Sequence, residues 1–379
     1  MSILTRRPRL RWLVPLLAAV LLVTGGAAVG AVGAVARGGL PDRSATRLLA
    51  DVQTAQLTGL SGTITEKADL GLPSIPGAQG GGSSSDLTSL ISGTHTLQLW
   101  YAGPQRVRLS LQGTLGESDV IRNGSDLWVW SSHDRTASHR TVPTGSDQQG
   151  PSAMSLPMTP QQAADEALKA IGPTTNVTTN PTAVVAGRSA YELVLQPKDA
   201  RSLVGEVRIA IDGATHVPMR VQVFPKGAGQ PALEVGFTSF DPTVPPSSSF
   251  TFSPPPGTKV TEATTPTSPG HGDVSPGGGG ARPQLVGDGW TSVAVTKVPS
   301  GAMAGGAPSG DGGGDGGGDG GSSLSSVLQS LPQVQGSWGS GRLLQGTLFS
   351  AILTTDGRLA VGAVPASVLE QALSTPSGG

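Results

Sequence analysis

The stretch LVGEVRIAIDGATHVPMRVQVFPKG, residues 203–227, decides the fold. Its apolar residues alternate with polar or small ones on both sides of the segment Asp212-Gly213-Ala214-Thr215. A period of two is typical of a half-buried β-strand, because successive side chains point to opposite faces of a sheet. Turn-forming residues between two such runs favour an antiparallel hairpin over a crossover connection. The core should therefore be a large antiparallel sheet with one face sealed and the other more open.

The same alternation recurs on both sides of this hairpin. GRSAYELVLQP at residues 187–197 precedes it, and ALEVGFTSFDP at residues 232–242 follows it. Two amphipathic stretches, residues 44–56 and 159–171, predict short helices that would lie against the sheet. Residues 132–158 are interpreted as a polar loop. Earlier strands are predicted at residues 60–66, 94–101, 106–112, 119–122 and 126–131.

Glycine and proline divide the chain into ordered and linking parts. Together they make 87 residues (56 plus 31) of 379, and they concentrate in two runs that lack the apolar residues needed for order. The apolar segments after these runs should join the main sheet, since a lone hairpin is only marginally stable in water. The predicted organisation is a signal or anchor segment at 1–37, a sheet domain at 38–262, a linker at 263–283, an additional strand region at 284–299, a Gly/Asp-rich linker at 300–323, and a C-terminal hairpin and helix at 324–379.

The N-terminus has the pattern of an export signal. Four arginines among the first eleven residues precede residues 12–36, which carry no charge. Two outcomes stay open: cleavage at Ala34-Val35-Ala36, or retention as a single anchor, since the run is long enough to span a bilayer. A retained anchor would keep the arginines in the cytoplasm and the rest of the chain outside. We therefore expect a protein on the extracytoplasmic side of the cell membrane, or a secreted one.

Composition and motifs argue against several functions. The formal net charge of -1 does not favour nucleic acid, and the absence of cysteine excludes disulfides, thiol nucleophiles and a lipid-modified cysteine. The sequence has no nucleophile elbow or phosphate loop, and no clear dinucleotide fingerprint. Glu66, Glu117 and Glu206 lie beside strands, but nothing pairs them for acid–base work. His133 and His139 are close in sequence, and we interpret them as exposed loop residues because no further metal ligands accompany them. The sequence thus predicts no enzyme, no cofactor and no metal.

Three short motifs give the sheet a family resemblance. They are Ile211-Asp212 leading to Val217-Pro218, Phe250-Thr251-Phe252 leading to PPPG at 254–257, and the strand ending in LWVW at 127–130. Over residues 44–260 the chain resembles the LolA/RseB-like lipoprotein-carrier superfamily of bacterial envelopes, which includes LppX-like proteins of actinobacterial type. The resemblance implies an α+β fold, in which helices pack on the concave side of a large curved antiparallel β-sheet, or half-open barrel. In family members the enclosed space takes acyl chains or lipoprotein.

Tryptophans stand out in the early strands. Trp128 and Trp130 share one face of their strand and Leu127 and Val129 the other, so both faces should be covered. Ordinary core packing is one interpretation of these indoles, and the lining of an apolar pocket is the other. Alternation alone does not say which face is concave. The hypothetical ligand-binding set is Trp100, Leu109, Trp128, Trp130, Leu195, Val221, Val223, Phe237 and Phe252.

The resemblance predicts a binding function. A membrane-tethered protein with an apolar half-barrel would act as a carrier or receptor for lipid or lipoprotein acyl chains, with hydrophobic transfer worth about 0.8 kcal/mol per buried methylene. The alternative is an RseB/MucB-like sensor of envelope stress that binds a membrane regulatory protein, such as an anti-sigma factor. Co-purified acyl lipid would favour the carrier, and a stoichiometric protein partner with an empty cavity would favour the sensor.

Overall fold

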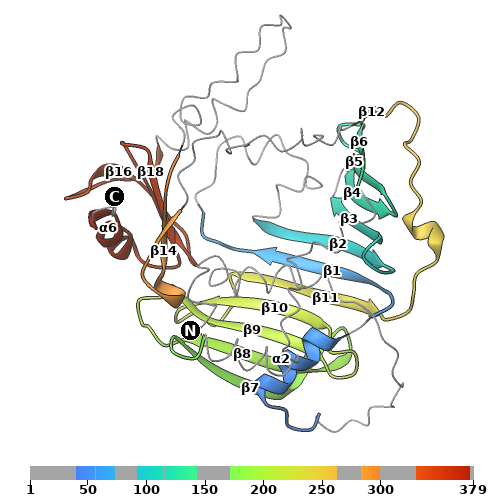
Figure 1. The fold of residues 1–379 in the computed structure, drawn as a ribbon, viewed down its shortest axis with the longest axis horizontal. Coiled ribbons are helices and arrows are strands. Elements are labelled where there is room, and N and C mark those ends of the chain that lie inside the picture. The colour runs from blue at the N-terminus through green and yellow to red at the C-terminus, as the bar shows by residue number, and fades with distance from the viewer. Residues whose placement is uncertain are drawn as a thin grey trace, which may run out of the picture.

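Two sheets make up the structure, one of 12 strands and one of 6, with short helices against them (Figure 1). The predicted segment 1–37 and the linker 300–323 lie outside the described residues, as do the helix at 159–171 and the linker at 263–283 except for the last residue of each. No helix within the described ranges is long and apolar enough to cross a membrane. The computed structural model describes residues 40–55, 57–72, 92–113, 116–142, 171–262, 283–298 and 330–375.

The larger sheet joins two halves of the chain. Its order is β12-β6-β5-β4-β3-β2-β1-β11-β10-β9-β8-β7, so β1 (Leu60–Ala68) pairs with β11 (Leu233–Asp241) across a long stretch of sequence. The neighbouring strands from β6 to β7 are antiparallel, whereas β12 runs parallel to β6. The sheet is curved and does not close, because β12 and β7 form two separate edges (Figure 1). This architecture confirms the predicted α+β class with a large, open antiparallel sheet.

The strands of the main sheet predicted from alternation lie close to their expected positions, but two strands of this sheet were missed. These are β6 (Thr136–Thr141) and β7 (Thr175–Val185), whose sequences are mostly polar. The loop interpretation of residues 132–158 is therefore wrong for β6. Both strands lie at or next to an edge of the sheet, where polar side chains and Pro181 are tolerated. The other strands are β2 (Gly93–Tyr101), β3 (Arg106–Gly113), β4 (Gly116–Asn123), β5 (Asp126–Ser131), β8 (Arg188–Pro197), β9 (Val204–Asp212), β10 (Pro218–Pro225) and β12 (Lys259–Glu262), and a 3-10 turn, η5, spans Ser247–Phe250.

Helix α2 (Ala45–Thr54) confirms the first predicted helix. The hydroxyl of Ser44 caps it by accepting a hydrogen bond from the backbone N–H of Arg47 at 3.3 Å. Leu48, on its apolar side, is buried in one cluster with Tyr191 and Leu193 of the main sheet. The helix therefore covers part of one face of the sheet, which we call the α2 face.

The C-terminal region forms a sheet of its own, contrary to the expectation that it joins the main sheet. Its order is β13-β14-β18-β17-β16-β15, and α6 (Ala366–Ser374) packs on it through Leu369 and Leu373. A lone hairpin would be unstable, but six strands and a helix bury a separate core around Ile352 and Ala360. The strands are β13 (Gln284–Val286), β14 (Val293–Lys297), β15 (Gln333–Gly336), β16 (Gly339–Gln345), β17 (Ser350–Thr354) and β18 (Arg358–Gly362), with the 3-10 turn η6 at Gly289–Thr291.

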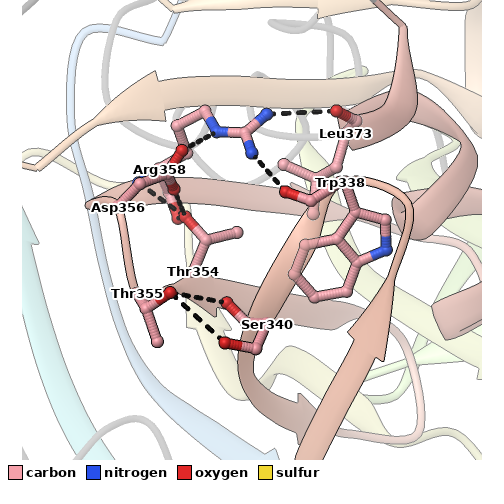
Figure 2. Close-up of polar contacts among 7 residues, drawn as sticks. All are labelled: Trp338, Ser340, Thr354, Thr355, Asp356, Arg358 and Leu373. Atoms are coloured by element: carbon pink, nitrogen blue, oxygen red, sulfur yellow. Dashed lines mark hydrogen bonds and ion pairs between the residues drawn. The ribbon is translucent and has the colours of Figure 1, made fainter.

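Arg358 ties the parts of this C-terminal unit together (Figure 2). Its guanidinium donates to the carbonyl oxygens of Trp338 at 2.8 Å and Leu373 at 3.0 Å, and to the carboxylate of Asp356 at 2.8 Å. Leu373 lies in the last turn of α6, where a cation can pair with carbonyl groups that the helix leaves unbonded. One side chain thus joins β18, the turn before β16 and the end of α6.

The C-terminal unit contacts the main sheet at the ends of its strands. The backbone N–H of Leu203 donates to the carbonyl of Ala363 at 2.8 Å, and that of Thr347 donates to the carbonyl of Leu70 at 2.8 Å. Leu348 is buried in the core cluster beneath α2. The C-terminal unit therefore fills one end of the α2 face with its own side chain.

Candidate ligand-binding face

One row of opposed residues crosses the α2 face. Glu66 on β1 is opposite Val235 on β11, and the row continues through Val221, Ile209 and Leu193 on the next three strands. Directly opposed residues in a sheet point to the same side. The row therefore consists of one acid followed by four apolar residues, and its far end packs with α2.

The strand register divides the nine predicted ligand-binding residues between two faces. Trp100, Trp128 and Trp130 lie on the face opposite to α2. Phe252 packs against Trp128 and Trp130, with ring-centroid distances of 5.4 and 5.9 Å. These nine residues therefore do not line one pocket. The five that the fold brings to the α2 face are Leu109, Leu195, Val221, Val223 and Phe237.

The protein's own side chains pack the inner part of the α2 face. Leu195 and Val221 are buried in one cluster with side chains of α2 and of the C-terminal unit, and Val223 packs against that cluster. Phe237 is buried in a neighbouring cluster. These four residues belong to the core of the structure, so a ligand space is better sought elsewhere on the same face.

The α2 face becomes more exposed towards the β12 edge of the sheet. Leu111 on β3 is fully buried, whereas Leu109 is half-buried and Val129 on β5 is 41% exposed. Leu109 is opposite Val120 on β4, which is opposite Val129. The expectation that both faces of β5 are covered is therefore wrong, because α2 packs near β7 at the other end of the sheet. We use the name outer strip for five apolar residues of this face, of which Val129 is exposed and the others are half-buried: Val107, Leu109, Val120, Leu127 and Val129. Arg122 lies on the same face between Val107 and Leu127.

The opposite face carries paired charges. Asp119 is completely buried, and Nη2 of Arg108 lies 2.5 Å from its Oδ2. His139 lies on β6 and not in an exposed loop, and its ring nitrogens are 2.9 Å from Oδ1 of Asp126 and 2.9 Å from Oε2 of Glu262. The hydrogen bond to Asp126, followed by that to Glu262, raises the pKa of His139. The described residues include no cluster of three His, Cys, Asp or Glu side chains that could hold a metal ion.

Glu66 differs from these paired acids. Its side chain is 6% exposed, and among the described residues neither carboxylate oxygen has a hydrogen-bond partner. Burial raises the pKa of Glu66 to about 7, and the charge of His95, which is directly opposite on β2, partly offsets that rise. Such a carboxyl group is either protonated near neutral pH or paired with a group that the chain does not supply.

Sequence reasoning identified Glu66 as an unpaired acid but missed its direction. Leu60, Ile64 and Ala68 of the same strand are separated from Glu66 by even numbers of residues, and all three are buried. The alternation in LSGTITEKA therefore already indicated that Glu66 points to the sealed face.

A cleft of about 650 Å³ lies where the two sheets meet. The indole of Trp290 forms part of its wall and donates a hydrogen bond from Nε1 to Oγ1 of Thr175 at 2.8 Å. Lys198, Arg201 and Asp199 contribute charge to the lining, and the last two form an ion pair at 2.7 Å. This volume lies in the range of small-ligand sites. Sequence reasoning missed the cleft because it placed both units in a single sheet.

Comparisons with known proteins give structural similarity alone. The chain matches no family model, and no curated protein matches it. Similar solved structures include the MucA/MucB complex of Pseudomonas aeruginosa (14% identity, 88% of this chain and 97% of that chain covered, TM-score 0.41). A LolA superfamily protein of Nitrosomonas europaea (8%, 56% and 99%, TM-score 0.21) and an uncharacterized conserved protein of Thermus thermophilus (10%, 58% and 100%, TM-score 0.33) are also similar. Such TM-scores assign neither a family nor a function to this chain.

Proposed function

We propose that this protein is a non-catalytic, extracytoplasmic binding protein that holds the hydrocarbon chain of a lipid or lipoprotein on the α2 face of its open sheet. The outer strip is the observation that supports this proposal. Its apolar side chains lie on the same face of the sheet as the buried core, but the rest of the chain covers them only partly. Each methylene removed from water there would contribute about 0.8 kcal/mol. The predicted N-terminal segment would keep this face close to a membrane.

Native mass spectrometry followed by lipid extraction tests this proposal. The proposal expects acyl lipid to accompany the purified protein and to be lost under organic extraction. It expects Val129→Asp to abolish this retention, because a charge would replace an exposed methyl surface of the strip. Val260→Asp is the matched control, since Val260 is 45% exposed, as against 41% for Val129, and lies on the opposite face of the sheet. Lipid retained equally by both variants, or by neither, contradicts the proposed face.

The second candidate function is a sensor that binds a membrane regulatory protein. The cleft between the sheets favours it, because an indole and mixed charges line a space open to a peptide segment. A purified regulator segment bound at one-to-one stoichiometry, with binding lost in Trp290→Ala and kept in Val129→Asp, would support this function. The reverse pattern of losses would support the lipid-binding function.

A further inference from the structure

Glu66 lies on β1, inside the buried part of the α2 face and between α2 and the outer strip. One side of it leads through Val235 and Val221 towards α2. On the other side, β2 and β3 lead to the outer strip, through Leu97 opposite Leu111 and Leu99 opposite Leu109. Glu66 and the opposite His95 are thus polar members of a mostly apolar stretch, two strands from the strip proposed to hold a hydrocarbon chain.

The described surroundings give this carboxylate no hydrogen-bond partner, and the charge of His95 offsets its burial only in part. Other deeply placed acids have partners: Glu192, which is 9% exposed, lies 3.4 Å from Nη2 of Arg220. Glu66 is directly opposite His95 on β2 and the uncharged Val235 on β11. Among the described residues, neither of its carboxylate oxygens accepts a hydrogen bond. Proteins pair almost all buried charged groups. An orphaned carboxylate on a ligand face therefore indicates a partner that arrives with the ligand.

We propose that Glu66 accepts hydrogen bonds from a protonated amine in the polar part of the bound amphiphile. This inference rests on the proposed lipid-binding function and specifies its ligand class. An ammonium group carries the opposite charge and several N–H donors for two carboxylate oxygens. A hydroxyl group would offer one donor and no charge, and an anionic head group would place like charges together.

Three amphiphiles with the same tail separate these chemistries: dodecylamine, dodecanol and dodecanoate. Their affinities are measured by displacement of a neutral fluorescent long-chain alcohol from the full chain, in the wild type, Glu66→Gln and the control Glu192→Gln. We expect wild type to prefer dodecylamine, and Glu66→Gln to weaken dodecylamine by about tenfold or more while changing dodecanol by less than about threefold. Glu192→Gln should leave the preference unchanged, because Glu192 already has a partner in Arg220.

Proton release gives a second readout that a structural role of Glu66 would not produce. At pH 6 the carboxyl group of Glu66 is mostly protonated, since its pKa is about 7. Pairing with an ammonium group requires the ionised form, so binding should release up to one proton per dodecylamine. Calorimetry at pH 6 in two buffers of different ionisation enthalpy should detect this proton in wild type and not in Glu66→Gln.

The possible outcomes distinguish a failure of the amine assignment from a failure of the lipid-binding function on which it rests. If none of the three amphiphiles binds the wild type, the proposed lipid-binding function fails and this inference fails with it. If dodecanol binds but Glu66→Gln leaves dodecylamine affinity and proton release unchanged, the amine assignment alone is overturned. Thermal unfolding of Glu66→Gln verifies that the variant is folded, as expected for the loss of an unpaired buried charge.

Discussion

Glu66 and Asp212 are both buried acids of the main sheet, but their surroundings are opposite. Asp212, at the end of β9, is 1% exposed and accepts hydrogen bonds from Nε and Nη2 of Arg188 at 2.7 and 2.9 Å and from the N–H of Thr215 at 2.7 Å. Burial alone would raise the pKa of Asp212, but the hydrogen bonds from Arg188 and Thr215 outweigh it and lower that pKa. Among the described residues Glu66 has no such partners, and burial raises its pKa to about 7.

This difference distinguishes a scaffold residue from a candidate binding residue. The partners of Asp212 come from the strand beside it and from the turn that follows it, so folding alone satisfies its charge. On its two neighbouring strands, Glu66 meets only a histidine and an apolar side chain. A buried carboxylate therefore stabilises the fold at Asp212, where the chain supplies its partners, whereas at Glu66 the ionised carboxylate needs a partner from outside the chain.

The largest expected effect is the loss of stability in Asp212→Asn. The substitution leaves Arg188 without its anion and should lower the free energy of unfolding by about 3 kcal/mol at pH 7. Since the folded pKa of Asp212 is lowered, this contribution should be lost as the pH falls below about 4. Urea unfolding between pH 3 and 7 measures it. Asp199→Asn is the control, because Asp199 pairs with Arg201 at the surface and its loss should lower the free energy of unfolding by less than about 1 kcal/mol. Equal losses of stability in the two variants would contradict the distinction between the buried and the surface ion pair.

Arg358 is a cation whose hydrogen-bond partners, like those of Asp212, all come from the chain itself. Arg358→Ala should destabilise the C-terminal unit by about 2 kcal/mol, because the carbonyl groups of Trp338 and Leu373 lose their donor. Arg342→Ala removes a donor to the single carbonyl of Leu331 and should have a smaller effect. Hydrogen exchange of α6 amides reports this unit directly. Faster exchange in Arg342→Ala than in Arg358→Ala would show that the network does not hold α6.

Glu66→Gln should change stability in the opposite direction to Asp212→Asn. In the unliganded wild type the unfolded state ionises Glu66 near pH 4.5, whereas the folded state does so near pH 7, so folding stability falls as the pH rises through this window. The variant should therefore be more stable than wild type by about 1–3 kcal/mol at pH 8 and equal to it at pH 4. Denaturant unfolding at both values tests this. A destabilised variant at pH 8 would mean that Glu66 has a partner within the chain.

The smallest expected effect is that of replacing His139, which pairs with Asp126 and Glu262 near one edge of the sheet. Its pKa is raised by Asp126 and Glu262, so its ion pairs are complete below about pH 6.5 and weaken as the pH rises through the folded pKa. His139→Gln should therefore loosen the pairing of β12 with β6 at pH 6 more than at pH 9. Amide exchange of Val260 and Thr261, compared with that of Val221, measures this change. Equal protection of β12 in wild type and variant at pH 6 would contradict it.

The main sheet was predictable because its strands alternate strongly. Val207 and Val221, for example, are buried residues in runs of alternating sequence, and the turn at Asp212 marks the hairpin between them. β6 and β7 were not predictable on this basis, since edge strands are selected for polar side chains that leave no alternation.

The candidate site was only partly predictable. Parity places Leu109 and Phe237 on one face and Trp128 on the other once the register is known, but register depends on pairings between distant strands, such as β1 with β11. The separate C-terminal sheet follows from the joint burial of β14 and β16 to β18 with α6, which no single segment reveals. The inward direction of Glu66, in contrast, was available from its own strand.

Methyl NMR with a spin-labelled long-chain alcohol is the most direct test of hydrocarbon binding on the α2 face, because the neutral head group does not repel Glu66. With leucine and valine methyl groups labelled, we expect paramagnetic broadening of Leu109, Val120 and Val129 on the outer strip. Val260, which is similarly exposed on the opposite face, should remain sharp. Broadening of Val260 with the strip unaffected, or no broadening at all, would contradict lipid binding on the α2 face.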